Sequence, residues 1–527
     1  MRPNNQTLAL LSCLVLFISL VVLNVNAASP SELAQVPLLL FKPPAETATV
    51  FNKTDQDYID YAWRSFIALN WPARRPLGGE NRGLPDVSEG TYPGSAKPLV
   101  WETWPYTGEV FLPSGNWKQT PGFKGTTDYP MWRELPVKPS FPVTNQSGKI
   151  TSYQSPPPPP CASRAEKEGA LLLQAINQPG ESIKHGPVGP LYDQNGYSVR
   201  YQVGLNRSYF EYVRAEQYYE AEKQAPPPGF VALPPDEPGK PGMIEYKSAW
   251  KVLDEQERKS GRFYTRKAFF LSLPWRKDAS SPVQAGECFT DGGNAPVAFT
   301  VGLVAFHIHR VTYFGHVAMT FEPVDNVQIN PSRFDFPSSI PTPSFNPGLF
   351  SKNPPPYGKK GFRGEKPDVI SVERDSRFHA KLDKGEPPDV SRATPISLPF
   401  RQANAKYRAL MRQMGSVFQH YQLIGTQHVS ADCSRDSVSG KWSPGCPKPN
   451  LDILINAALE SYTQLVNPAG QLQNYSCKGC HQSARPCGVS WSAVPDYKGQ
   501  LMSFLLSKAK KKNTGYQEFL GGYNCNQ

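Results

Sequence analysis

Hydrophobic positions along the chain follow two periods, which divide it into helical ends and a β-rich middle. Aromatic and aliphatic side chains recur every three or four residues between Asp57 and Trp71, and the run stops at Pro72. This spacing places them on one side of a helix, and a proline at that position ends a helix. The same period predicts further helices, at Arg164–Asn177, Tyr209–Lys223, Gln402–Leu423, Leu451–Leu465 and Tyr497–Lys511.

The middle of the chain changes period. Segments rich in β-branched and aromatic residues, with short turns between them, predict strands at Met243–Val252, Arg262–Leu273, Ala298–Tyr313 and His316–Phe321. The 55 prolines include tracts such as Pro156–Pro160, which are typical of extended loops because they cannot donate backbone hydrogen bonds. We expect an α+β fold: a loop- and proline-rich β-containing scaffold with flanking helices over residues 28–400, and a small helical region over residues 401–527.

The N-terminus has the pattern of an export signal. Arg2 precedes an apolar run from Leu8 to Val25, and Val25-Asn26-Ala27 offers small residues at the positions that a signal peptidase recognises. We expect residues 1–27 to be a signal peptide and the mature chain to be periplasmic or extracellular. The run is also long enough to remain as an uncleaved membrane anchor, which is the alternative.

Residues 477–481, Cys-Lys-Gly-Cys-His, form a C-x-x-C-H sequence. Two cysteines three residues apart on one helical turn can each form a thioether with a vinyl group of haem, and the histidine after them then reaches the iron. The motif predicts one covalently bound haem c. Cys477 and Cys480 are its expected anchors, and His481 is the expected proximal iron ligand. Residues 401–527 therefore become a cytochrome c-like haem-binding region.

Two other readings of the motif are a redox C-x-x-C and half of a zinc site. A redox site of the thioredoxin type needs a βαβ context, which the hydrophobic pattern does not contain. A zinc site needs a second Cys/His pair at ligand spacing, and Cys487 alone does not supply one.

The remaining cysteines of the expected mature chain suit disulfide bonds. They form an even set: Cys161, Cys288, Cys433, Cys446, Cys487 and Cys525. We prefer a short loop closed by Cys433 and Cys446, with Cys487 bonded to Cys525 and Cys161 to Cys288, although the sequence allows other pairings.

The sixth iron ligand stays open at this level. Only 46 residues follow His481, so helices before the motif must supply part of the haem pocket. Met502 is the only methionine after the motif, and it is either a thioether ligand or a core residue of a helix. Three histidines of the expected strands are further candidates, since the first two share one strand face: His307, His309 and His316. His420 and His428, near the end of a predicted helix, have a weaker claim.

The chain is basic, with a formal net charge of +11 and a pI near 9.0. Four lysines lie close to the motif in sequence: Lys508, Lys510, Lys511 and Lys512. They indicate a redox partner protein with an acidic surface, while the alternative is a solvated helix end, where cations are favoured. Nucleic acid is not an expected partner of an exported protein.

Several short blocks over most of the expected mature chain resemble a group of large exported bacterial cytochrome c-like proteins with one haem motif close to the C-terminus. The blocks are Ala62–Pro72, Val199–Asn206, Gly302–Ile308, Thr320–Asn326, Leu423–Gln427 and Ser476–His481. The resemblance implies haem c binding and electron transfer, and it implies no particular substrate. It places His307 on the histidine of the third block, as a candidate distal ligand. In the fourth block the family pattern has histidine where this chain has Pro323, so no role is assigned there.

Together these features predict a single-haem c-type cytochrome that transfers electrons outside the cytoplasm. Two alternatives stay open. One is a haem-dependent oxidoreductase, resembling a peroxidase or an oxidase, with an open distal position; the size of the scaffold favours it. The other is a haem-based sensor or binding protein.

Overall fold

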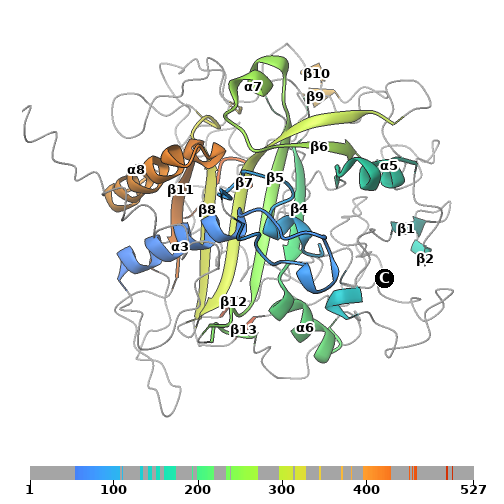
Figure 1. Cartoon of the computed structure of the whole chain (residues 1–527), viewed down its shortest axis with the longest axis horizontal. Coiled ribbons are helices and arrows are strands. Elements are labelled where there is room, and N and C mark those ends of the chain that lie inside the picture. Colours follow the sequence, from blue (N-terminus) through green and yellow to red (C-terminus); the bar gives the residue numbers. More distant parts are fainter. Residues whose placement is uncertain are drawn as a thin grey trace, which may run out of the picture.

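The computed structural model in Figure 1 describes the sheet of the chain and the helices around it. The described residues are 54–106 except 89, then 110, 131–134, 141–144, 150–154, 160–173, 191–218 except 192, 194–196 and 198, 233–270 except 238, 296–327 except 313–314, 344–345, 370–371, 381–382, 396–428, 450, 454, 456–459, 494–495 and 501–502. The expected signal peptide lies outside them. No helix within this set is long and apolar enough to cross a membrane.

A mixed sheet of seven strands is the centre of the fold (Figure 1). Five strands follow one another across it: β11 (Tyr421–Gln427), β8 (Gly315–Pro323), β7 (Ala298–Thr312), β5 (Ile244–Val252) and β4 (Arg200–Leu205). β6 (Thr265–Phe270) pairs with β7, and β3 (Leu171–Leu173) pairs with β6 in parallel, while the other neighbours are antiparallel. Helices and a mixed sheet together confirm the expected α+β class.

Strand β7 organises the sheet because its 15 residues pair with three other strands. One edge of β7 pairs with β5. The other edge pairs first with β6, where Gly302 lies opposite Thr265, and then with β8, where Phe306 lies opposite Phe321. Three two-stranded pairs lie outside this sheet: β1 (Phe141–Thr144) with β2 (Ile150–Gln154), β9 (Ile370–Ser371) with β10 (Lys381–Leu382), and β12 (Val494–Pro495) with β13 (Leu501–Met502).

Helix α3 (Asp55–Leu69) crosses the front of the sheet in Figure 1, and α8 (Leu398–Gln413) lies beside it and packs on β11. A capping box begins α3, since Thr54 Oγ1 accepts a hydrogen bond from the Asp57 amide and Asp57 Oδ2 accepts one from the Thr54 amide. The other described helices are α5 (Pro160–Glu168), α6 (Arg207–Ala215), α7 (Glu255–Ser260) and the 3-10 turns η1 (Gly79–Asn81), η2 (Val100–Thr103), η5 (Trp132–Glu134) and η8 (Val417–His420).

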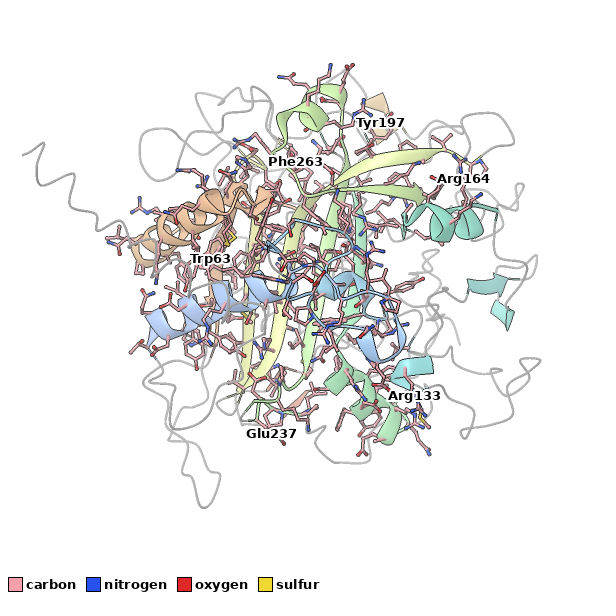
Figure 2. All side chains as sticks on the ribbon, in the orientation of Figure 1. Trp63, Arg133, Arg164, Tyr197, Glu237 and Phe263 are labelled. Atoms are coloured by element: carbon pink, nitrogen blue, oxygen red, sulfur yellow. The ribbon has the colours of Figure 1, made fainter. Side chains whose placement is uncertain are left out.

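An aromatic core fills the space between α3 and the sheet. Phe66 of α3 stacks on Phe321 of β8 with ring centroids 4.1 Å apart, and Trp63 stacks on Tyr407 of α8 at 5.2 Å. On the same side, Trp101 lies 5.0 Å from Phe306 of β7. Figure 2 shows side chains filling the region between the ribbons around Trp63. Burial of rings of this size is the largest favourable contribution that a single residue makes to the fold.

The periodic segments with the clearest pattern have the expected structure. The helix expected at Asp57–Trp71 is α3, and the four strands expected in the middle of the chain are β5, β6, β7 and β8. The helices expected at Arg164–Asn177 and Tyr209–Lys223 are α5 and α6, and both end earlier than expected. Residues Leu171–Leu173, after α5, pair with β6 instead of extending the helix.

Three expected helices are wrong over part or all of their described residues. The helix expected at Gln402–Leu423 ends at Gln413, since Gly415 has a φ of 70° and Tyr421–Gln427 then joins β8 as strand β11. Within the helix expected at Leu451–Leu465, residues 457–459 form a turn. Within the helix expected at Tyr497–Lys511, Leu501 and Met502 form β13. At residues 421–427, backbone hydrogen bonds to β8, a strand distant in the sequence, outweighed the helix-like spacing of the apolar residues.

The sheet also extends past residue 400, where the sequence analysis placed the start of a separate helical region. Strand β11 is its edge strand, and α8 packs on β11 and on α3. Elements on either side of residue 400 therefore share one sheet and one hydrophobic core.

Candidate functional site

The two faces of the sheet carry different side chains. Phe306 and Arg310 of β7 contact α3, at Phe66 and Ser65 respectively. Because side chains alternate along a strand, His307 and His309 of β7 project from the opposite face. The prediction that these two histidines share one face is confirmed, and the face they occupy is the one away from α3.

Neighbouring strands place further ionisable residues beside these histidines. Strand β5 sets Lys247 opposite His307 and Glu245 opposite His309. Strand β8 sets His316 opposite Val311, and the rings of His316 and His309 lie 6.4 Å apart, nearly perpendicular to each other. Directly opposite residues in a ladder project from the same face. The ionisable residues on these three adjacent strands are called the histidine strip: Glu245, Lys247, His307, His309 and His316.

The histidine strip is buried. His307, His309 and His316 are 9%, 7% and 8% exposed, and Glu245 is 1% exposed. The Lys247 side chain is 12% exposed, and its Nζ lies 3.8 Å from Glu245 Oε1. Ionisable groups are rarely buried without a structural or functional reason, so the strip is the leading candidate site among the described residues.

Burial changes the protonation of two members of the strip. It raises the pKa of the Glu245 carboxyl to about 7, and the charge of Lys247 opposes that rise. Burial also lowers the pKa of His316 to about 3. In both groups the apolar surroundings favour the uncharged form. His316 is therefore a neutral imidazole at physiological pH, the form that binds metal ions.

His316 has a second unusual property. Neither its Nδ1 nor its Nε2 has a hydrogen-bond partner in the part of the chain that the structure describes. Buried polar atoms in native proteins are generally hydrogen-bonded, and one without a partner calls for an explanation such as a bound ion or water. A ring with two available nitrogens inside the protein is suited to bind a ligand.

Residues 456–459, which precede the C-x-x-C-H motif in the sequence, lie on this same face. Asn456 Nδ2 donates to Thr320 Oγ1 at 2.9 Å and to the Phe321 carbonyl at 3.0 Å. The Ala457 amide donates to Glu322 Oε2 at 3.0 Å. Thr320 lies opposite His307 in the β7–β8 ladder, so residues 456–459 cover the face that carries the histidine strip.

Strand β4 contributes a further anchor for this segment. The Tyr201 hydroxyl donates to the Ala458 carbonyl at 3.0 Å. Apolar side chains from β4, β5 and β7 pack with residues 457–459 in a second, smaller core: Tyr201, Ala249, Val304, Ala305, Ala457, Ala458 and Leu459 are among them. After the motif, β12 also lies against β8. The described stretches on both sides of the motif thus contact the same strand.

The other candidate residues from the sequence lie in other elements or outside the described residues. Cys477, Cys480 and His481 lie outside the described residues. Met502 belongs to β13, which pairs with β12, so the helix expected around it is wrong at this point. Cys161 is disulfide-bonded, and every other cysteine, Cys288 included, lies outside the described set.

His420 and His428 have separate surroundings. His420 belongs to η8, where burial and then the charge of Arg262 lower its pKa to about 4. His428 stacks on Tyr58 of α3 with ring centroids 3.4 Å apart, and its Nε2 lies 3.5 Å from Asp55 Oδ1. Its ring therefore lies on the α3 side of the sheet.

Sequence reasoning missed Glu245 and Lys247. They occupy alternate positions, two residues apart, in a strand that otherwise carries mostly aromatic and aliphatic residues at this end, and their spacing of two was the available signal. Their proximity to the histidines depends on the β5–β7 register. Among the described residues, no group of three or more His, Cys, Asp or Glu side chains has a geometry that could hold a metal ion by itself.

Comparison of the chain with protein-family models, with curated proteins and with solved structures found no match.

Proposed function

We propose that this chain is an exported single-haem c-type cytochrome that transfers electrons in the periplasm or outside the cell. Cys477 and Cys480 bind one haem c covalently, and His481 is the proximal iron ligand. The observation that carries the proposal is the C-x-x-C-H sequence at residues 477–481, downstream of an apolar N-terminal run. The bound haem supplies a one-electron couple, whose potential depends on its axial ligands and burial.

The histidine strip fits a neighbouring haem. The strip offers buried imidazoles, and residues 456–459 and β12, on either side of the motif, both contact β8. In this proposal the sheet provides one wall of the haem pocket.

Two finer features belong to the same proposal. The segment that carries the motif is helical, because the two cysteines and the histidine must lie on one helical turn to bind the same haem, and it resembles cytochrome c in this respect. The basic residues Lys508, Lys510, Lys511 and Lys512 then steer an acidic redox partner toward the exposed haem edge.

The test is covalent haem on the exported protein. Wild-type protein from a host that matures c-type cytochromes should give the pyridine haemochrome spectrum of haem c and retain haem stain after denaturing electrophoresis. The double variant Cys477→Ala/Cys480→Ala should lose both signals. The control Cys433→Ala/Cys446→Ala removes two other cysteines and should keep them. A wild-type tryptic peptide spanning the motif without the mass of haem would refute the proposal.

A haem-dependent oxidoreductase is the second candidate function, and Glu245 favours it. This carboxyl lies opposite His309, and with a pKa raised by burial to about 7 it can give or take a proton near neutral pH. Carbon monoxide and peroxide separate the two functions. A low-spin iron that binds neither supports the electron carrier, and a high-spin iron that binds both supports the oxidoreductase.

A further inference from the structure

Helix α8 is basic and contains no acidic residue. Its 16 residues include Arg401, Lys406, Arg408 and Arg412, and no Asp or Glu. The absence of acidic residues extends on both sides of the helix, over residues 391–431 of the sequence. No negative charge of the same stretch therefore balances these cations, and α8 is a local source of positive potential.

Three of the four cations form a row along one side of α8. Spacings of seven and eleven residues correspond to about two and about three turns of a helix, so the side chains of Arg401, Arg408 and Arg412 project from the same side. We call these three residues the arginine row. Arg412 is exposed, and Arg401 and Arg408 are partly exposed.

The contacts of α8 place the arginine row beside η8 and not beside α3. On the α3 side, the Tyr407 hydroxyl donates to Asp60 Oδ1 at 2.7 Å, and Lys406 Nζ lies 3.6 Å from the same oxygen. Arg408 Nε instead donates to the Gln419 carbonyl of η8 at 2.7 Å. The carboxylate of α3 therefore lies on the Lys406 side of the helix, away from the row.

The charge of the row acts on a histidine of η8. Burial is the largest cause of the low pKa of His420, about 4, and the charge of Arg262 is the next. Arg408 and Arg412 lower this pKa as well. Arg262 is itself paired, since its Nε lies 2.5 Å and its Nη2 3.0 Å from the two carboxylate oxygens of Asp325. The excess positive charge at this place therefore comes from α8.

We propose that the arginine row is the docking surface for a partner protein with an acidic surface. A guanidinium binds a carboxylate through two parallel hydrogen bonds, and arginine is enriched in protein interfaces where lysine is depleted. A partner that engages the whole row presents Asp or Glu side chains over about 16 Å, the rise of α8 from Arg401 to Arg412. Ala405 and Ala409 are exposed beside the row, and their small side chains let a partner approach α8 closely.

The outer side of α8 fits a protein better than a lipid surface. A helix that lies in a membrane surface inserts large apolar side chains between the lipids. In α8 the large side chains Phe400, Tyr407 and Met411 are buried against the rest of the protein. Apart from Leu398 and Pro399 at its start, the exposed residues of α8 are cations, glutamines and alanines.

The inference goes beyond the proposed function and does not require haem, because no residue of the row belongs to the C-x-x-C-H motif. The probe is fluorescently labelled poly-L-glutamate, whose affinity for the full chain is measured by anisotropy at increasing salt. Arg401→Gln/Arg412→Gln should weaken binding about tenfold at low salt and reduce its salt dependence. Arg258→Gln/Lys259→Gln removes the same charge from the exposed last turn of α7 and should weaken binding by less than about twofold.

The second probe is a vesicle of phosphatidylglycerol, and its binding should be the same in the wild type and in Arg401→Gln/Arg412→Gln. Vesicle binding that falls in this variant assigns the row to a membrane and overturns the protein partner. Equal weakening of poly-L-glutamate binding by the α8 and α7 variants, or no weakening by the α8 variant, overturns the docking surface. If circular dichroism shows that Arg401→Gln/Arg412→Gln does not fold, Arg412→Glu compared with Arg258→Glu gives the same decision.

Haem stain of the same samples separates this inference from the proposed function. A chain without covalent haem that binds poly-L-glutamate through α8 contradicts the proposed function alone. A haem-loaded chain whose binding ignores the α8 substitutions contradicts the docking surface alone.

Discussion

The two faces of the sheet hold buried ionisable groups in different ways. On the α3 face, Arg310 Nη2 lies 2.9 Å from Asp236 Oδ1, and the Ser65 hydroxyl accepts a second bond from the same guanidinium. Asp236 also accepts bonds from the Tyr61 hydroxyl at 2.6 Å and from the Gly242 amide at 2.7 Å. This charged pair joins α3, the sheet and a loop, and its bonds compensate for its burial.

On the histidine face, Glu245 and His316 are buried with fewer bonds among the described residues. In the described part of the chain, Glu245 Oε1 lies 3.8 Å from Lys247 Nζ, and Glu245 Oε2 has no hydrogen-bond partner. His316 lacks a partner at both ring nitrogens there. The α3 face also holds a buried atom without a hydrogen-bond partner among the described residues, Trp63 Nε1, so the difference concerns the ionisable groups of the two faces. The Arg310–Asp236 pair is therefore a structural contact, and the opposite face carries the candidate site.

The largest effect should come from breaking the pair on the α3 face. Asp236→Ala leaves the Arg310 charge buried without its carboxylate and removes acceptors from Tyr61 and Gly242. We expect a loss of about 3–5 kcal/mol in the free energy of unfolding, measured by urea denaturation. Glu237→Ala, at the exposed neighbouring position, is the matched control and should change stability by no more than about 0.5 kcal/mol. Equal losses of unfolding free energy in Asp236→Ala and Glu237→Ala would contradict the structural role of the Arg310–Asp236 pair on the α3 face.

On the histidine face, removing a charge should stabilise the protein instead. Glu245 has an ordinary pKa of 4.5 and a folded-state pKa raised by burial to about 7. Its contribution to stability is therefore fully present below pH 4.5 and is lost as the pH rises through about 7. Glu245→Gln does not ionise, so it should gain up to about 3 kcal/mol over the wild type at pH 8 and much less at pH 5. Urea denaturation at both pH values measures this difference.

The exposed variant Glu237→Gln serves as the control for Glu245→Gln and should show no such pH-dependent gain. A Glu245→Gln variant that is less stable than the wild type at pH 8 would mean that the carboxylate is bonded in the folded protein and that the histidine face resembles the α3 face.

The anchor of the segment before the motif is the next test. Asn456→Ala removes the donors to Thr320 Oγ1 and to the Phe321 carbonyl, both buried, and should cost about 2 kcal/mol in the free energy of unfolding. Hydrogen exchange of the Ala457 and Leu459 amides should rise with it; the Ala458 amide does not serve as a probe, because it donates to Asn456 Oδ1, which the substitution also removes. Asn81→Ala, which removes one exposed bond to the Pro76 carbonyl, is the control. Unchanged hydrogen exchange of the Ala457 and Leu459 amides in Asn456→Ala would show that the bonds of Asn456 to β8 do not hold this segment in place.

The smallest expected effect is at the second anchor. Tyr201→Phe removes one hydrogen bond, to the Ala458 carbonyl, and keeps the ring, so a loss of about 1 kcal/mol is expected in urea denaturation. Combined with Asn456→Ala, the two losses should not add, since both residues hold one short segment. Strict additivity would mean that Tyr201 and Asn456 fix independent parts of the chain.

Sequence reasoning succeeded where the pattern is local. The helix α3 and the strands β5–β8 follow from the period of their apolar residues, and the shared face of His307 and His309 follows from their spacing of two. It failed at β11, where an apparently helical segment becomes a strand along the edge of β8. It also failed at Leu171–Leu173, which pair with β6. In both places the hydrogen-bond partner lies far away in the sequence, so no local window contains the deciding interaction.

The sequence by itself determined the type of α3 and of strands β5–β8, the even set of cysteines and the C-x-x-C-H motif on which the proposed function depends, because each of these depends on residues that are neighbours in the sequence. Only the tertiary structure decided that Glu245 and Lys247 face the histidines, that His316 lies beside His309, and that residues 456–459 lie on this same face. Those facts depend on strand register and on burial. For β5 and for Asn456, the contacts join segments that the sequence separates by tens to more than a hundred residues. β7 and β8 follow one another in the sequence, so there only the register of the pair was left to the tertiary structure.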